Sequence, residues 1–100
     1  MVYNISMIKS FKHKGLENFY KNGSTKGIQG KHKIKLKQLL MILDAMTSTE
    51  DLKAPFLRLH KLQGKMQNLY SITVQANWRL TFEFNDDTQN VYILDYIDYH

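Results

Sequence analysis

The sequence predicts an α+β fold in which two N-terminal helices pack on one face of an antiparallel, mostly meander, β-sheet. The main observation is a change of hydrophobic period at Pro55, from about 3.6 residues before it to two residues after it. Short turn-rich segments separate the later apolar runs, so successive strands should pair with their neighbours. The chain has 100 residues, of which 43% are hydrophobic, and we expect a single domain over residues 1–100.

Two helices are expected before Pro55. Residues 15–20 place Leu16, Phe19 and Tyr20 at positions i, i+3 and i+4, and the Asn-Gly-Ser run that follows should end this short helix. Residues 31–47 form the longest helix candidate, with a buried stripe made of Leu36, Leu39, Leu40, Leu43 and Met46. Ser48 then suits the N-cap of one short helical turn with acidic residues at its start. Residues 8–11 are a weaker candidate for a short strand.

Four strands are expected after Pro55, over residues 57–62, 69–75, 78–84 and 91 to the end. In the second strand, alternation puts Ser71, Thr73 and Gln75 on one face and the apolar residues on the other. Ala76 and Asn77 should form the tight turn to the third strand. Trp78, Leu80, Phe82 and Phe84 of that strand should point inward.

Charge is distributed unevenly along the chain. The net charge is +5, but residues 1–43 contain nine lysines and one acid (+8), whereas residues 44–100 contain five cations and eight acids (−3). A basic half indicates an anionic partner, with RNA or DNA first. A solvated helix face that uses lysine is an equally good interpretation of the charge alone.

Several kinds of chemistry find no support in the sequence. The chain has no cysteine, which excludes disulfides, thiolate catalysis and cysteine-ligated zinc. It has no Gly-rich phosphate loop after a strand and no recognised metal-ligand spacing, so we expect neither a metal nor another cofactor. No apolar run approaches the roughly 18–20 residues of a membrane span, and the N-terminus does not resemble a signal peptide. We therefore expect a cytoplasmic protein without membrane contact.

The C-terminus gathers groups that can transfer protons. In an extended strand Tyr96, Asp98 and His100 share one face, and Tyr99 points the other way. An aspartate two residues from a histidine can orient the ring, and histidine suits proton transfer at neutral pH. A frayed polar terminus is the commoner fate of such a segment.

Cations and a further histidine lie on the predicted sheet. Arg79 should lie on the polar face of the third strand, where its planar fork can hold a phosphate or pair with Glu83. Arg58 and His60 should share one face of the first strand. Histidine, aspartate, tyrosine and arginine suffice to cleave RNA, because RNA supplies its own nucleophile, the 2′-OH. The composition permits this chemistry without demanding it.

Five segments carry a resemblance to a known family. The opening MIKSFKHKGL (residues 7–16), the hairpin YSITVQANWRLTF (70–82) and the ending DYH (98–100) resemble those of HigB-type toxins, also called plasmid maintenance killer proteins. The segment RLHKLQG (58–64) resembles their R-L-H-P-L-K-G strand, and residues 43–52 resemble the end of their long helix. The resemblance covers residues 7–100 in order and without large gaps. HigB-type toxins are a branch of the RelE superfamily of toxin–antitoxin systems.

The resemblance implies a RelE-like fold and cleavage of messenger RNA on the translating 70S ribosome, where the basic N-terminal half would contact ribosomal RNA. It also implies a HigA-like helix-turn-helix antitoxin, with DNA bound only through the antitoxin complex. Carried over by position, the catalytic set is His60, Arg79, Asp98, Tyr99 and His100. His100 or His60 would be general base or acid, Asp98 the orienting group, and Arg79 the phosphate ligand. Tyr99 would donate a hydrogen bond or stack on a base. The further cations expected to contact RNA phosphate are Arg58, Lys61 and Lys65.

The sequence also departs from the family pattern. Lys61 replaces the proline and Gln63 the lysine of R-L-H-P-L-K-G, and Gln75 stands where close relatives often have arginine. Two cations are thus missing near the proposed site, unless Lys61 and Lys65 compensate. The alternative function is a catalytically weakened, toxin-like module that binds only antitoxin and RNA. A DNA-binding repressor is disfavoured, because eight Gly/Ser-rich residues, not three or four, separate the two helices. Residues 1–6 lie outside the resemblance as a possible N-terminal extension.

Overall fold

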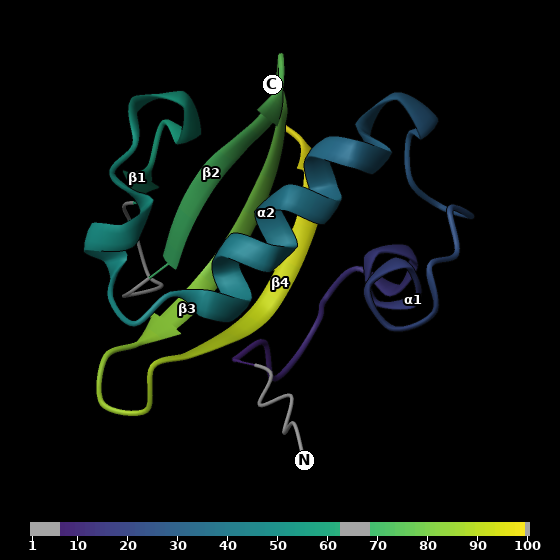
Figure 1. The fold of residues 1–100 in the computed structure, drawn as a ribbon. Coiled ribbons are helices and arrows are strands. Elements are labelled where there is room, and N and C mark those ends of the chain that lie inside the picture. Colours follow the sequence, from purple (N-terminus) through teal and green to yellow (C-terminus); the bar gives the residue numbers. More distant parts are fainter. Residues whose placement is uncertain (1–6, 63–68, 100) are drawn as a thin grey trace.

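A computed structural model describes residues 7–62 and 69–99 of the chain. Its sheet has four antiparallel strands in the order β1 (His60–Lys61), β2 (Leu69–Gln75), β3 (Trp78–Asn85) and β4 (Asn90–Asp98). The predicted meander is therefore confirmed, and so is the α+β fold. Helix α2 (Lys33–Ala45) lies across one face of the sheet, and α1 (Lys14–Asn22) lies beside α2 toward the β4 edge (Figure 1).

The core forms where the α2 stripe meets the inner face of the sheet. Every member of the stripe predicted from the 3.6-residue period is buried, at 4% exposure or less, and so are the inward residues Leu80, Phe82 and Phe84 of β3. All of them belong to one hydrophobic cluster. Each fully buried large side chain stabilises the fold by about 1.5–3 kcal/mol relative to its exposed state. The residues predicted from the helix period and those predicted from the strand period thus pack in a single core.

Local signals set the ends of the helices. His13 is the N-cap of α1, and its Nδ1 accepts a hydrogen bond from the Leu16 amide at 2.9 Å. Gly23 ends α1 in the left-handed region at φ 76°, which glycine adopts without steric cost. A 3₁₀ turn, η1 (Gly30–His32), precedes α2, so the long helix begins two residues later than expected. The predicted Ser48 cap is confirmed: it starts η2 (Thr49–Leu52) in a capping box with Asp51.

The first predicted strand is much shorter in the structure, and its predicted range of 57–62 is wrong. Residues Pro55–Leu57 form a 3₁₀ turn, η3, which ends with Arg58 in the left-handed region at φ 48°. Proline fixes its own φ near the helical value, which favours this turn. The Leu57 side chain is buried although it belongs to the turn and not to a strand. The extended chain resumes only at His60, so Arg58 does not share a strand face with it.

The N-terminal segment pairs with the outer edge of β4. Ile8 and Phe11 form isolated parallel bridges with Val91 and Leu94, in place of the continuous strand expected over residues 8–11. The pairing coincides with a bulge in β4, where Ile93 has a φ of 48° and its amide donates to Ser10 Oγ at 2.7 Å. The bulge redirects the edge strand and leaves it covered by the N-terminal segment.

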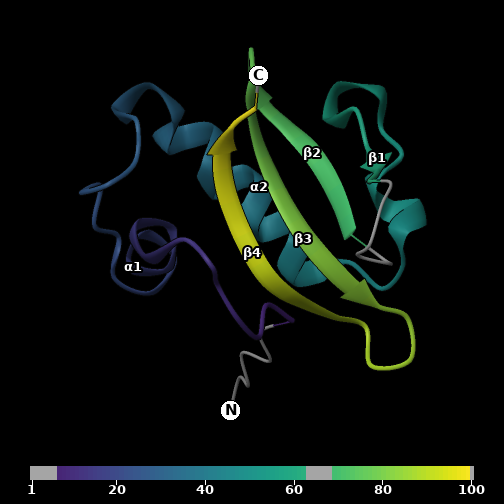
Figure 2. The ribbon, with the colours of Figure 1, turned by 180° about the vertical axis from the view of Figure 1, so that it is seen from behind.

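The other face of the sheet is free of helices in the part of the chain that the structure describes. Seen from behind, β2, β3 and β4 lie in front of α2, and α1 lies to one side of β4 (Figure 2). Within the described ranges, no helix has the length and apolar character needed to cross a membrane. We call the side of the sheet that no described helix covers the open face.

Candidate active site

Strand register shows which side chains share the open face. His60 lies opposite Ser71, which lies opposite Thr81, and these three residues form one row across β1, β2 and β3. The next row joins Thr73 to Arg79 and continues to Ile97 on β4. Directly opposed residues project to the same side of a sheet. His60 and Arg79 therefore share the open face, in neighbouring rows.

A β-bulge moves Gln75 to the opposite side. The β2–β3 register shifts between Thr73 and Gln75, so that Gln75 pairs with the inward-facing Trp78. The Gln75 Oε1 atom lies 2.9 Å from the Nε2 atom of His32, beside α2. The expectation that Gln75 shares a face with Thr73 is therefore wrong, because an extra residue in one strand breaks the alternation.

The β2–β3 turn holds Arg79 in place. The Arg79 guanidinium donates to the carbonyl oxygens of Ala76 and Trp78, the second at 3.1 Å. Among the described residues it forms these backbone contacts and no ion pair with Glu83. Ala76 itself adopts φ 51°, which is uncommon for a residue with a Cβ atom. The turn therefore orients the cation expected to bind phosphate.

The same turn anchors the C-terminal tail. The last paired residue of β4 is Asp98, opposite Trp78, and the Tyr99 amide then donates to the Asn77 carbonyl at 2.8 Å. This extends the pairing to one residue before the end of the chain, where a frayed terminus is the usual outcome. The Tyr99 side chain is 54% exposed. His100 and Lys65 lie outside the described residues.

Alternation divides the predicted catalytic set between two faces. Asp98 pairs with Trp78 on the inner side, as expected from its spacing to Tyr96. Ile97 pairs with Arg79 and therefore shares its open face. Tyr99 follows two residues later, so its side chain projects to the same face. The structure thus gathers Arg79, Asp98 and Tyr99 at one end of the sheet.

His60 belongs to the far edge of the sheet. It lies on β1, and the tail follows β4, the opposite edge strand. Three strand spacings of about 4.8 Å make this separation on the order of 14 Å. His60, Arg58 and Lys61 are all exposed. An extended RNA strand, rather than direct contact, would have to link this edge to the tail.

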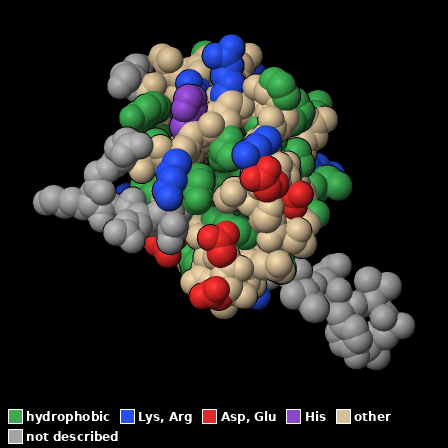
Figure 3. Space-filling view, turned by 90° about the vertical axis from the view of Figure 1, so that its left-hand side faces the viewer, with side chains coloured by type: hydrophobic (Ala, Val, Ile, Leu, Met, Phe, Trp, Pro, Cys, Tyr) green, Lys and Arg blue, Asp and Glu red, His purple; other side chains and the backbone are tan. Residues whose placement is uncertain are grey.

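Figure 3 shows the β1 side of the molecule in space-filling form. A histidine lies near Lys and Arg side chains in the upper part of this view, and acidic side chains lie in its middle and lower parts, some of them against a Lys or Arg side chain. The upper part of this side is thus locally basic, which suits the approach of a phosphate backbone.

Sequence reasoning missed a buried polar cluster behind the tail. His32 is 1% exposed, and its ring contacts both Gln75 and the hydroxyl of Tyr96, with Nδ1 to Oη at 2.6 Å. Burial raises the pKa of Tyr96, and the hydrogen bond from the Gln29 amide opposes this in part. His32 stands among lysines in the sequence, a pattern typical of a solvated helix start, so no sequence signal indicated its burial.

Thr73 is a second residue that the motifs did not indicate. It lies directly opposite Arg79, and its Oγ1 atom is buried with no hydrogen-bond partner within the described ranges. A buried hydroxyl without a partner costs about 1–3 kcal/mol. Polar side chains thus extend from Arg79 toward the row of His60, over the middle of the open face.

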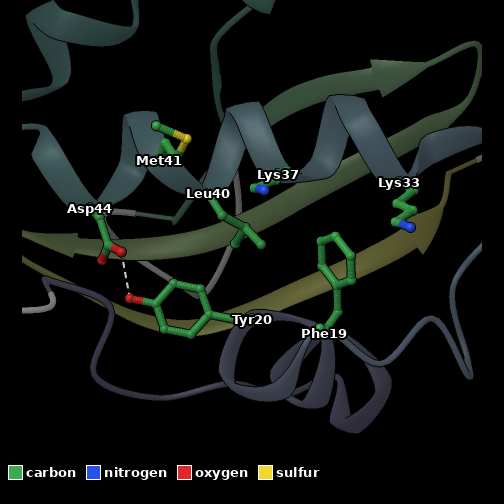
Figure 4. Close-up of a pocket in the computed structure, with 8 residues that line it drawn as sticks. Phe19, Tyr20, Lys33, Lys37, Leu40, Met41 and Asp44 are labelled. Carbon is green, nitrogen blue, oxygen red and sulfur yellow. Dashed lines mark hydrogen bonds between the residues drawn. The ribbon is translucent and has the colours of Figure 1, made fainter.

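A hollow on the helix side is separate from this site. A pocket of about 350 Å³ lies between α1 and α2, and its lining is Phe19, Tyr20, Gly23, Lys33, Lys37, Leu40, Met41 and Asp44. Figure 4 shows Tyr20 of α1 reaching Asp44 of α2 through a hydrogen bond. None of the predicted catalytic residues lines the pocket, and neither Arg58 nor Lys61 does, whereas Lys33 and Lys37 of the basic N-terminal half do.

The described side chains do not form a metal site. Within residues 7–62 and 69–99, no three histidine, aspartate or glutamate side chains cluster as a metal site would require. The expectation that the chain needs no metal stays a prediction, since it rests on the chemistry of the residue set.

Comparison with known proteins shows the family of the chain. Residues 9–100 match the family model of the HigB-like toxins, described as RelE-like toxins of the type II toxin–antitoxin system HigB. The chain is 43% identical over 95 residues to a Proteus vulgaris protein named Endoribonuclease HigB, and the match covers 94% of this chain and 100% of that relative. The four-stranded meander with its helices on one side agrees with this assignment. The chain therefore belongs to the HigB-like family of RelE-like toxins.

Proposed function

We propose that this protein is an endoribonuclease that cleaves messenger RNA on the translating ribosome by attack of the 2′-OH on the adjacent phosphodiester. The observation that carries the proposal is the β2–β3 turn, which holds both Arg79 and the backbone of Tyr99 at one end of the open sheet face. The name of the Proteus vulgaris relative supports RNA as the substrate class.

The reaction needs two proton transfers and charge stabilisation. A base removes the proton of the 2′-OH, whose oxygen forms a new bond to phosphorus. The bond from phosphorus to the 5′ oxygen breaks, and an acid protonates that leaving oxygen. The products are a 2′,3′-cyclic phosphate and a 5′-hydroxyl, so atoms and charges balance without a co-reactant.

The residues of the tail and the turn suit these steps. With Nη1 held by the turn carbonyls, the other guanidinium N–H groups of Arg79 would donate to the phosphate and stabilise the charge that develops there. His100 would act as base or acid, with Asp98 holding its ring, and Tyr99 would donate to the RNA or stack on a base. His60 would reach the RNA from the β1 edge and supply the second proton-transfer group.

The β1 edge would hold the RNA backbone. Arg58 and Lys61 are exposed beside His60, and Lys65 follows them outside the described residues. Such exposed cations give affinity without sequence preference, and salt weakens their contacts. These cations would take part of the role of the two family cations that Gln63 and Gln75 replace.

The ribosome would be contacted by the lysine-rich N-terminal half. Lys9, Lys12, Lys26, Lys31 and Lys33 are all exposed. Only Lys14 and Lys21 of this half form ion pairs within the described residues, both with Glu17. The remaining positive charge is available for ribosomal RNA, and binding should weaken steeply with salt.

The helix side suits a protein partner. Ile34, Met41 and Phe56 are exposed by 74%, 64% and 58%. Exposed apolar side chains of this size favour a protein over RNA. The partner that the family implies is a HigA-like helix-turn-helix antitoxin, and DNA would be bound only through the complex of the two proteins.

One observation keeps a binding-only function as the second candidate. The Gln75 amide contacts His32 on the inner side, so it offers no replacement for a phosphate-binding arginine on the open face. If Lys61 and Lys65 do not supply the missing charge, the chain would bind antitoxin and RNA without cleaving.

Induction of the chain alone in a bacterial culture separates the two candidates. We expect growth arrest and new messenger RNA 5′ ends within translated regions, and loss of both in His100→Ala and Arg79→Ala. The matched control is Glu83→Gln, because Glu83 lies on the same strand and face as Arg79 but four residues away. Growth and intact messenger RNA with well-expressed, folded wild-type protein would leave only the binding module.

A further inference from the structure

His32 is the most completely buried histidine of the described chain, with 1% of its surface exposed. It is the last residue of the 3₁₀ turn η1, directly before α2. Both ring nitrogens have partners: Nδ1 lies 2.6 Å from the Tyr96 hydroxyl and Nε2 lies 2.9 Å from Gln75 Oε1. None of these three residues belongs to the catalytic set proposed above.

The hydrogen bonds fix the protonation of the ring. Gln75 presents a carbonyl oxygen, which can only accept, so Nε2 carries the proton. The Tyr96 hydroxyl accepts from the Gln29 amide at 3.3 Å, which directs its own proton to the lone pair of Nδ1. The cluster is therefore complete with a neutral His32 in one tautomer.

The three partners join separate strands at the end of the sheet that carries the tail. Gln75 is the last residue of β2, and Tyr96 belongs to β4. Between them Trp78 of β3 stacks on Tyr96, with ring centroids 4.6 Å apart, and meets the edge of the His32 ring at 5.5 Å. One imidazole thus links three neighbouring strands to the start of α2.

The linked residues are direct neighbours of the proposed active groups. Gln75 precedes Ala76 and Asn77, whose carbonyls hold Arg79 and the Tyr99 amide. Tyr96 lies two residues before Asp98 on the same strand face. A displacement of Gln75 or Tyr96 would therefore move both the turn and the tail that pairs with it.

We propose that His32 is a positioning residue, whose two hydrogen bonds hold the β2–β3 turn and the end of β4 in the geometry that the C-terminal tail needs for RNA cleavage. This inference rests on the proposed function. It also gives Gln75 a role: an arginine at this position, as in close relatives, has no acceptor for the Nε2 proton. In this chain Gln75 serves the buried cluster and not the phosphate.

The test compares His32→Leu with Val91→Ala. Leucine fills much of the imidazole volume but makes neither hydrogen bond. Val91 is a buried residue near the opposite end of β4, and its truncation lowers stability without contact to the cluster. Each variant is assayed at the same number of degrees below its own melting temperature. Antitoxin binding checks that both variants fold.

Two readouts distinguish positioning from general stability. We expect His32→Leu to lower kcat for messenger RNA on programmed ribosomes by about 10–100-fold with little change in KM, because small misplacements of reacting groups have such effects. We also expect faster hydrogen exchange at the Tyr99 amide. Val91→Ala should change neither. Equal kcat and equal Tyr99 exchange in the two variants would overturn the proposal.

Milder variants keep the test decisive if His32→Leu does not fold. Tyr96→Phe removes only the bond to Nδ1, and Gln75→Ala only the bond to Nε2; each should shift kcat and Tyr99 exchange in the same direction by less. Nitrogen-15 spectra of wild-type His32 should show protonated Nε2 and unprotonated Nδ1, and the reverse tautomer would contradict the argument. If wild type does not cleave RNA, the proposed function fails, while Tyr99 exchange still decides whether His32 positions the tail.

Discussion

The two ends of the proposed site are held very differently. At the β2–β3 turn, Arg79 donates to two backbone carbonyls, the Tyr99 amide bonds Asn77, and a buried histidine supports the turn from behind. At the β1 edge, a strand of only two residues carries the exposed His60 and Lys61, and Arg58 precedes it in a left-handed conformation. Chemistry that needs fixed geometry belongs at the first end, and adaptable backbone binding at the second.

Loss of Arg79 should have the largest effect. Arg79→Ala removes the cation that the turn carbonyls hold, and we expect cleavage of ribosome-bound messenger RNA to fall by about 100–1,000-fold, as for loss of one preorganised donor to a developing charge. Single-turnover rates measure this. A reduction no greater than that of Arg58→Ala would erase the distinction between the two ends.

Gln75→Arg tests whether the family cation can simply be restored. We expect a loss of stability of about 1–3 kcal/mol, because the buried Nε2 proton of His32 loses its acceptor. Urea unfolding measures the change, with Gln38→Arg on the exposed side of α2 as the control. A stability equal to wild type, together with faster cleavage, would show that phosphate binding outweighs the buried contact.

Substitutions at the β1 edge should change how strongly salt weakens RNA binding. Removal of Lys61 or Arg58 deletes one phosphate contact each, so the slope of log affinity for single-stranded RNA against log salt should fall by about 0.7 per residue. The cleavage rate at saturation should change little. Lys53→Ala is the control, because Lys53 is exposed but pairs with Glu50. An unchanged slope would remove Arg58 and Lys61 from the RNA path.

Ala76→Gly examines the conformation of the turn itself. Ala76 has φ 51°, where glycine avoids the steric penalty of a Cβ atom. We expect a gain of up to about 1 kcal/mol in unfolding free energy, with Arg79 and Tyr99 still held by the turn carbonyls. Thermal unfolding measures the gain, and a clear loss of stability would mean that the Ala76 methyl group contributes packing that outweighs its strain.

A small effect is expected at η2, which contains none of the residues proposed for the site. The backbone amides of Thr47 and Ser48 donate to the Asp51 carboxylate and lower its pKa. A carboxyl whose folded pKa is lowered stabilises the protein above its unfolded pKa and loses this contribution as the pH falls through the folded value. The stability difference between wild type and Asp51→Asn should therefore be constant near neutral pH and shrink below about pH 4. A constant difference down to pH 2 would contradict the assigned cause.

Much of the fold was predictable because it follows from regular periods. The α2 stripe from Leu36 to Met46 and the alternation of β3 need only helix and strand geometry, and both are confirmed. The short β1 was not predictable, because Leu57 packs from a 3₁₀ turn rather than a strand. The face of Gln75 was missed for a similar reason: a bulge depends on the partner strand and leaves no periodic signal.

The candidate site was accessible from sequence only through motif resemblance. Residues 98–100 alone look like a polar chain end, and nothing in their composition indicates that the Tyr99 amide is fixed by Asn77. His32 gave no signal at all, because its neighbours are lysines and its partners are 43 and 64 residues away in the sequence. Contacts of this range arise from the tertiary fold, which local patterns do not encode.

The most direct test of the account is the chemistry of the RNA ends made by the purified chain on programmed 70S ribosomes. The account predicts a 2′,3′-cyclic phosphate and a 5′-hydroxyl at each cut, formed by wild type and not by His100→Ala, with little cleavage of the same RNA without ribosomes. Ends bearing a 5′-phosphate, or no cleavage by folded wild-type protein, would contradict the proposed attack by the 2′-OH.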